Sequence, residues 1–200
     1  MAVKKTKRSK QLFKSLVFGK KGKGLQSFLL TEIILIFLIG ILGYFELPIY
    51  IPIHYGMNGI PNGYGQSWLF PLLSIILVIA PIIVLLTVKY RFKLLNKYPY
   101  FINMPAFYFS EITRMKRDKR SYWVNKYFEL ILGAGVSIAG LMIVMIIGLL
   151  ESSVNYFLSQ DISILSILWI LATIVIMFYY LRDLYKQVLN KDKVRSKVIN

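Results

Sequence analysis

Few residues in this chain are able to do acid–base or metal chemistry, and they lie far apart. His54 is the single histidine, and the chain has no cysteine. Zinc sites take three or four closely placed ligands, yet His54, Glu46, Glu151 and Asp161 show no i, i+3 or i, i+4 pairing. Ser67 lies in no nucleophile elbow, and no phosphate-binding glycine loop is present. We therefore expect a non-enzymatic protein with no catalytic residue, no metal site and no cofactor.

His54 lies in an uncharged segment, residues 51–63, that contains two prolines and three glycines. Prolines stop helices and favour extended backbone before them, and glycines permit turns. The run 60–63, with proline second, predicts a tight turn within a compact, ordered loop. His54 would either order this loop through a hydrogen bond or contact a ligand in a pH-sensitive way. The candidate ligand-binding or loop-ordering residues are Pro52, His54, Gly59, Pro61, Asn62, Gly63 and Tyr64.

Four long apolar segments must position this loop. They cover residues 27–47, 68–88, 130–150 and 162–181. Each is long enough to cross a bilayer as a helix, and lipid offers the backbone no other way to satisfy its hydrogen bonds. The sequence therefore predicts an all-α, polytopic membrane protein with four transmembrane helices.

The basic residues predict the orientation of these helices. All 25 Lys and Arg lie in residues 1–26, 89–129 and 182–200, and none lies in the other two connections. The positive-inside rule then places both termini and the middle loop in the cytoplasm. The loop around His54 faces outward. Nucleic acid is not an expected partner, because its binding would not predict two connections without a basic residue.

This pattern divides the chain into a basic cytoplasmic tail, two hairpins of two spans each, a basic cytoplasmic loop and a second tail. The boundaries are 1–26, 27–90, 91–129, 130–182 and 183–200. Residues 9–18 and 105–119 have the apolar spacing of short amphipathic helices. We expect them to lie on an anionic inner leaflet or to form a docking platform for a cytosolic partner.

The spans themselves carry few polar residues. Glu32 is the intramembrane acid, predicted about one turn inside its span. It would reach the interface, pair with a lysine, or take part in proton or ion transfer. Gly133, Ser137 and Gly140 share one face of the third span and predict close helix packing, within the bundle or between copies. The candidates for hydrogen bonds between helices on the fourth span are Ser163, Ser166 and Thr173.

The loop also resembles a known family. The runs Leu47-Pro48, Pro52-Ile53-His54-Tyr55 and Gly59-Ile60-Pro61-Asn62-Gly63-Tyr64-Gly65 are similar to the signature of the domain of unknown function 1648 family. The resemblance covers about residues 30–90. That domain links two membrane helices and occurs in SdpI-type immunity membrane proteins. The resemblance implies protection against, or sensing of, an extracellular toxic peptide.

Three functions are therefore open. The first is a membrane protein that senses or neutralises an extracellular peptide through the outer loop. The second is a small transporter that uses Glu32 and the proline at position 81. The third is an accessory subunit of a larger membrane complex, with a membrane protein partner on the small-residue face of the third span.

Overall fold

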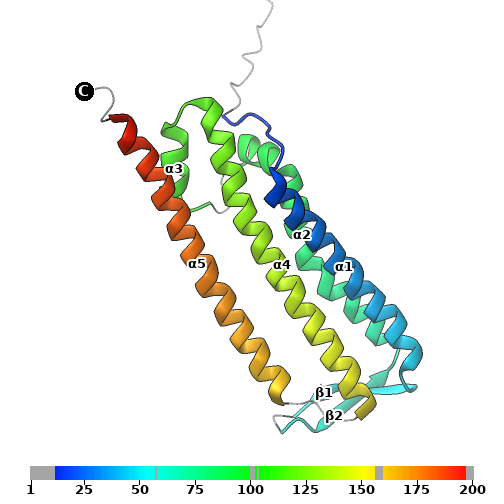
Figure 1. The fold of residues 1–200 in the computed structure, drawn as a ribbon. Coiled ribbons are helices and arrows are strands. Elements are labelled where there is room, and N and C mark those ends of the chain that lie inside the picture. Colours follow the sequence, from blue (N-terminus) through cyan, green and yellow to red (C-terminus); the bar gives the residue numbers. More distant parts are fainter. Residues whose placement is uncertain (1–11, 57, 100–101, 103, 156–159, 197–200) are drawn as a thin grey trace, which may run out of the picture.

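A computed structural model of the chain describes residues 12–56, 58–99, 102, 104–155 and 160–196. Four long helices lie side by side in it (Figure 1): α1 (Lys20–Glu46), α2 (Leu69–Lys97), α4 (Arg117–Asn155) and α5 (Gln160–Ser196). Each is long and apolar enough to cross a membrane. The predicted architecture, a helical protein with four membrane-spanning helices, is confirmed.

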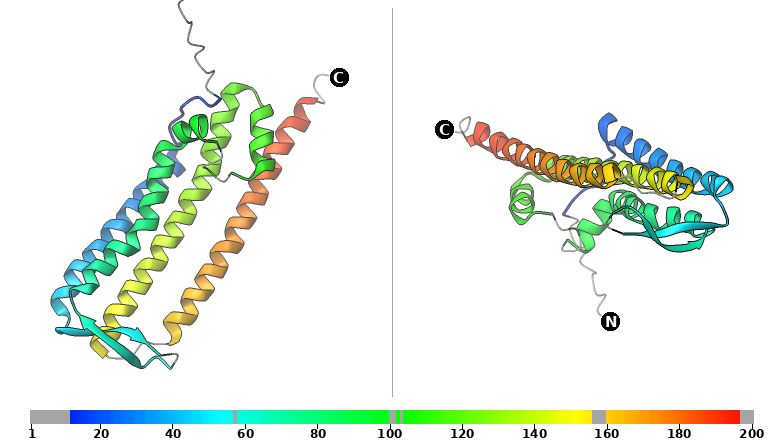
Figure 2. Two further views of the ribbon diagram at one scale, coloured as in Figure 1. Left: turned by 180° about the vertical axis from the view of Figure 1, so that it is seen from behind. Right: turned by 90° about the horizontal axis from the view of Figure 1, so that it is seen from below.

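Two smaller elements lie at opposite ends of the bundle (Figure 2). Strands β1 (Tyr50–Tyr55) and β2 (Pro61–Gln66) form an antiparallel pair at what we call the hairpin end. Helix α3 (Ala106–Arg114) lies at the other end, together with the first and last described residues. The described Lys and Arg residues gather there too, so we call it the lysine-rich end. The sequence did not predict the strands.

The helices continue beyond their predicted apolar segments at the lysine-rich end. α1 begins at Lys20, α2 ends at Lys97, and α4 begins at Arg117. The segment 91–129, predicted as a loop, is therefore mostly helical. Lys and Arg are good helix formers, and buried side chains such as Leu95 and Phe128 continue the apolar contacts past the spans.

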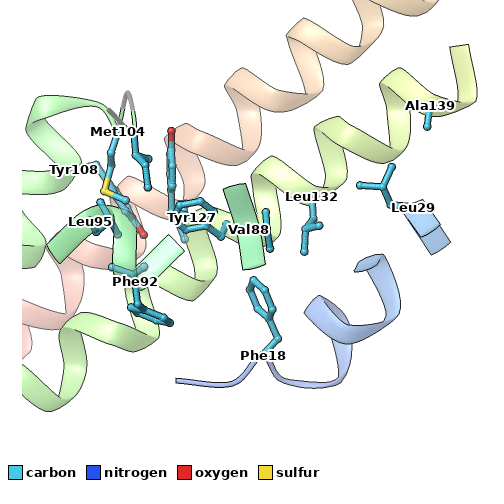
Figure 3. Packing of buried hydrophobic residues seen from close by; sticks show 14 of the residues in the cluster. Phe18, Leu29, Val88, Phe92, Leu95, Met104, Tyr108, Tyr127, Leu132 and Ala139 are labelled. Atoms are coloured by element: carbon cyan, nitrogen blue, oxygen red, sulfur yellow. The ribbon is translucent and has the colours of Figure 1, made fainter. Parts of the chain in front are cut away.

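Helices α1, α2 and α4 pack against one another, whereas α5 packs mainly against α4. The buried cluster between α1, α2 and α4 includes Leu29, Val88, Leu132 and Ala139 (Figure 3). By contrast, large apolar side chains remain exposed along most of α5. In a membrane such side chains face lipid or another helix.

The described part of the first predicted amphipathic helix (9–18), residues 12–18, is not helical, so that prediction is wrong there. We call residues 12–19 the N-terminal strap. Its carbonyl oxygens accept hydrogen bonds from side chains of α2 and α4: Arg91 Nη2 binds the Leu16 oxygen at 2.7 Å, and Asn125 Nδ2 binds the Val17 oxygen at 3.1 Å. These side chains replace the bonds that a helix would make to itself.

Aromatic side chains fix the strap further. Phe13 and Phe18 are buried, and the Arg91 guanidinium lies 3.8 Å from the centre of the Phe18 ring. The Asn96 side chain forms hydrogen bonds with both backbone polar groups of Phe13. Its Oδ1 accepts from the Phe13 N–H and its Nδ2 donates to the Phe13 oxygen, each at 2.9 Å. The strap is thus an extended segment held in the bundle at the lysine-rich end.

The second predicted amphipathic helix, residues 105–119, forms only in part, as α3: this helix begins directly after Pro105 and ends at Arg114, and residues 117–119 belong to α4. Tyr108 and Ile112 are the buried residues of α3. On its other side Phe107 packs edge-on against Tyr185 of α5, with ring centres 4.8 Å apart. Helix α3 therefore packs against protein, on α4 and α5.

Candidate functional site

The hairpin places most of the candidate loop residues in two paired strands. Pro52 lies opposite Tyr64, His54 opposite Gly63, and Tyr55 opposite Pro61, with irregular register on both sides of His54. A Cβ on Gly63 would lie 3.0 Å from the Cβ of His54. Glycine at position 63 thus lets the histidine cross over the neighbouring strand.

The turn lies at residues 56–60, so the turn predicted at 60–63 is wrong. Gly59 has a φ of 76°, a conformation that glycine adopts without strain. The Gly56 N–H donates to the Ile60 oxygen at 2.8 Å, and the Ile60 N–H donates to Asn58 Oδ1 at 3.2 Å. Pro61 instead begins β2, a position where strands tolerate the missing N–H.

His54 and Asn62 meet across the hairpin. Nδ1 of His54 is hydrogen-bonded to Oδ1 of Asn62, which requires the proton to lie on Nδ1. Both residues are exposed. In the neutral ring Nε2 then has a free lone pair, able to accept a hydrogen bond from a ligand. This arrangement fits both predicted roles of His54, ordering the loop and contacting a ligand.

Large apolar side chains surround this polar pair. Each of them is more than half exposed, although all come from one twenty-residue segment: Ile49, Tyr50, Ile53, Ile60, Tyr64 and Trp68. The two strands pair only with each other in the described part of the chain, so each has one edge without a strand partner there. Clustered exposed apolar side chains beside open strand edges are typical of binding surfaces.

The hairpin is attached to the bundle rather than free. The Tyr55 hydroxyl lies 2.7 Å from the Ser152 hydroxyl of α4, and Ile51 is buried. The Ser67 N–H donates to the Ile49 oxygen at 2.9 Å, which closes the base of the hairpin. Sequence reasoning missed Tyr55 and Ser152, because nothing in the spacing of two residues so far apart signals their contact.

Glu32 lies near the middle of α1, because this helix begins at Lys20, before the apolar span. It is buried, and its carboxylate lies against Gly140 of α4, with Oε1 3.5 Å from where a Cβ on Gly140 would be. The Trp169 ring of α5 also lies against Gly140, 3.2 Å from the same Cβ position. The structure thus brings together Glu32 and Gly140, which were predicted separately.

The small residues of α4 make different contacts. The Ser137 hydroxyl is 2.6 Å from the Thr173 hydroxyl of α5, and its oxygen accepts from the Trp169 indole at 3.0 Å. Gly133 has nothing within 4 Å of a built Cβ, so the close packing predicted for it is not observed. Gly135 has that role instead, because a Cβ there would lie 2.7 Å from Val84 and 3.1 Å from Leu29.

The fold defines a multi-pass membrane protein with an ordered hairpin at one end. In the described residues no group of three or more His, Cys, Asp or Glu side chains is placed to hold a metal ion. Residues 33–85 match the family described as Domain of unknown function (DUF1648), which agrees with the predicted resemblance. The match covers the hairpin and most of the two helices that flank it.

A relative extends the similarity beyond this domain. An uncharacterized protein of Archaeoglobus fulgidus is 43% identical over 120 residues, which is 57% of this chain and 65% of the relative. The aligned region is thus slightly less than two thirds of that protein. No solved structure matches the chain.

Proposed function

We propose that this protein is a non-enzymatic receptor or immunity protein of a prokaryotic cell membrane that binds an extracellular peptide through its hairpin. The described ends of the chain lie together at the lysine-rich end, opposite the hairpin. Basic residues concentrate on the cytoplasmic side of membrane proteins. Both termini would therefore be cytoplasmic and the hairpin external.

The exposed surface of the hairpin carries this proposal. An extended peptide would add to an open strand edge through backbone hydrogen bonds, and its apolar side chains would cover Tyr50 and Tyr64. His54 and Asn62 would supply polar contacts at the centre. Exposed aromatic side chains such as tyrosine and tryptophan are enriched in the cores of protein interfaces.

The lysine-rich end supports the orientation. Lys89, Lys93 and Lys97 follow one another at four-residue spacing on one face of α2, and all are exposed. Like charges at this spacing destabilise a helix, and none of the three forms an ion pair with a described residue. The anionic headgroups of the inner leaflet would neutralise them.

Growth in the presence of secreted peptides tests the proposed function. Cells with the gene deleted, or carrying Tyr50→Ser together with Tyr64→Ser, should be inhibited by conditioned medium from producing strains at concentrations that wild-type cells tolerate. His54→Ala should have the same effect in weaker form. The measured quantity is the lowest inhibitory dilution of the medium, at equal membrane levels of each variant.

The matched control is Tyr98→Ser, which removes an exposed tyrosine at the opposite end of the bundle. It should leave the inhibitory dilution unchanged. If the deletion strain and the hairpin variants tolerate the medium as well as wild type does, the proposed function is wrong.

A further inference from the structure

Glu32 is a buried acid that the hairpin does not use. Its side chain is 7% exposed, and Oε2 has no hydrogen-bond partner among the described residues. An unpaired carboxylate inside a membrane bundle is costly, and such groups are functional in most membrane proteins that have them. Glu32 therefore requires either a proton or a partner that the resting structure does not supply.

The elements packed around Glu32 offer no countercharge. The spans of α2 (69–88) and α4 (130–150), and residues 164–181 of α5, contain no Asp, Glu, His, Lys or Arg. The two ion pairs in the described residues, Lys126 with Glu129 and Arg114 with Glu111, lie outside these stretches. The neighbours of the carboxyl group at Gly140 are neutral.

A cavity of about 540 Å³ lies between α4 and α5 beside the start of α1, and its lining on α4 extends to Ser137, three residues before Gly140. At the lysine-rich end of the bundle its lining includes four charged side chains. They are Lys21, Lys126, Glu129 and Asp183. Its deepest polar residues are the hydrogen-bonded hydroxyls of Ser137 and Thr173.

Residues of α4 that line this cavity recur at helical spacing. It is lined by residues 122, 126, 130, 133 and 137, so Gly140 begins the next turn. Trp169 connects the two places, because its indole N–H donates to Ser137 while its ring lies against Gly140 beside Glu32. The cavity is large enough to hold water, and its charged and hydroxyl side chains are able to form hydrogen bonds with that water.

The path from Glu32 toward the hairpin end is closely packed. A Cβ on Gly40 would collide with Ser74 of α2, and one on Gly43 would lie 3.0 Å from Leu150 of α4. A second cavity along this part of α1, about 520 Å³, is lined by apolar side chains except for Glu46. It offers water no continuous set of polar partners.

We propose that Glu32 is a proton-binding site that exchanges with the cytoplasmic solution through the cavity between α4 and α5. A proton fits this site better than a metal cation. Hard cations need several oxygen ligands, whereas the Ser137 and Thr173 hydroxyls are already bonded to each other. The inference does not rest on peptide binding at the hairpin. It supplies a site for the small-transporter alternative.

Infrared spectroscopy on the full chain in lipid vesicles tests the proposal. Near neutral pH, where exposed carboxyl groups are ionised, wild-type protein should show a protonated-carboxyl C=O band whose intensity changes with pH. Glu32→Gln should abolish this band, whereas the control Glu46→Gln should retain it. A wild-type protein without such a band, or a band that persists in Glu32→Gln, would overturn the assignment of Glu32.

The route is tested separately, by the rate at which the band shifts on transfer to D₂O. Gly133→Phe should fill the cavity, because Gly133 lines it and a side chain there meets no neighbour at its Cβ. It should slow exchange about tenfold or more by removing the space for water. Ile174→Phe, on an exposed part of α5 away from the cavity lining, should not.

Both of these variants retain Glu32, so the comparison holds even where Glu32→Gln fails to fold. Equal exchange rates in Gly133→Phe, Ile174→Phe and wild type would contradict entry through this cavity. Peptide tolerance measured with Glu32→Gln cells should match wild type, which separates this test from that of the hairpin.

Discussion

Arg91→Met should lower the free energy of unfolding by about 3 kcal/mol, because the substitution removes three hydrogen bonds made by a buried charged group and leaves Oδ1 of Asn125 without its Arg91 donor. Arg91 is 7% exposed and donates to the oxygens of Leu16 and Val88 and to Oδ1 of Asn125. Its guanidinium also lies over the Phe18 ring. The change should appear as a lower midpoint of thermal unfolding in mild detergent.

The same variant should release the N-terminal strap. Trypsin should then cleave after Lys14 faster than in wild type, because the strap loses the hydrogen bond from Arg91 to the Leu16 oxygen and the guanidinium contact with the Phe18 ring. Lys93→Met is the matched control, since it removes an exposed positive charge from the same helix. An unfolding midpoint in Arg91→Met equal to that of Lys93→Met would show that Arg91 does not hold the strap.

Gly135→Ala should destabilise the protein by about 2 kcal/mol, since overpacking a filled site typically costs this much. The added Cβ would lie 2.7 Å from Val84 Cγ1, at the point where α1, α2 and α4 meet. Valine is stiff within a helix and has little freedom to move away. The helices would have to separate.

Gly133→Ala, two residues away on the same helix, provides the control. Nothing lies within 4 Å of its added Cβ. Alanine is a better helix former than glycine by up to about 1 kcal/mol, so this variant should be unchanged or more stable. Equal unfolding midpoints for the two variants would contradict the packing described for Gly135.

The sequence predicts the parts of this fold that depend on local composition. The length of the apolar segments identifies the four spans, and the positions of Lys and Arg predict which helix ends lie on the same side. It also singles out Glu32, Ser137, Gly140 and His54. It does not predict which glycine is crowded, because Gly133 and Gly135 differ only in which neighbouring helix they face.

The errors have a common physical cause, which is contact between distant segments. Residues 12–19 have the spacing of a helix but are extended, because Arg91, Asn96 and Asn125 bind their backbone. The strands 50–55 and 61–66 form despite their prolines and glycines, because the hairpin has Gly59 at its turn and Tyr55 on Ser152. Local pattern carries none of this information.

The orientation of the hairpin is the claim on which the proposed function depends, and cysteine labelling tests it most directly. The chain has no cysteine of its own, so single cysteines introduced by Ile60→Cys and Lys116→Cys report on one position each. Both positions are exposed, the first in the hairpin and the second at the lysine-rich end. Intact cells are treated with a maleimide that does not cross membranes. We expect Ile60→Cys to be labelled as fully as in lysed cells, and Lys116→Cys to be labelled only after lysis. The reverse pattern would place the hairpin in the cytoplasm and contradict recognition of an extracellular peptide.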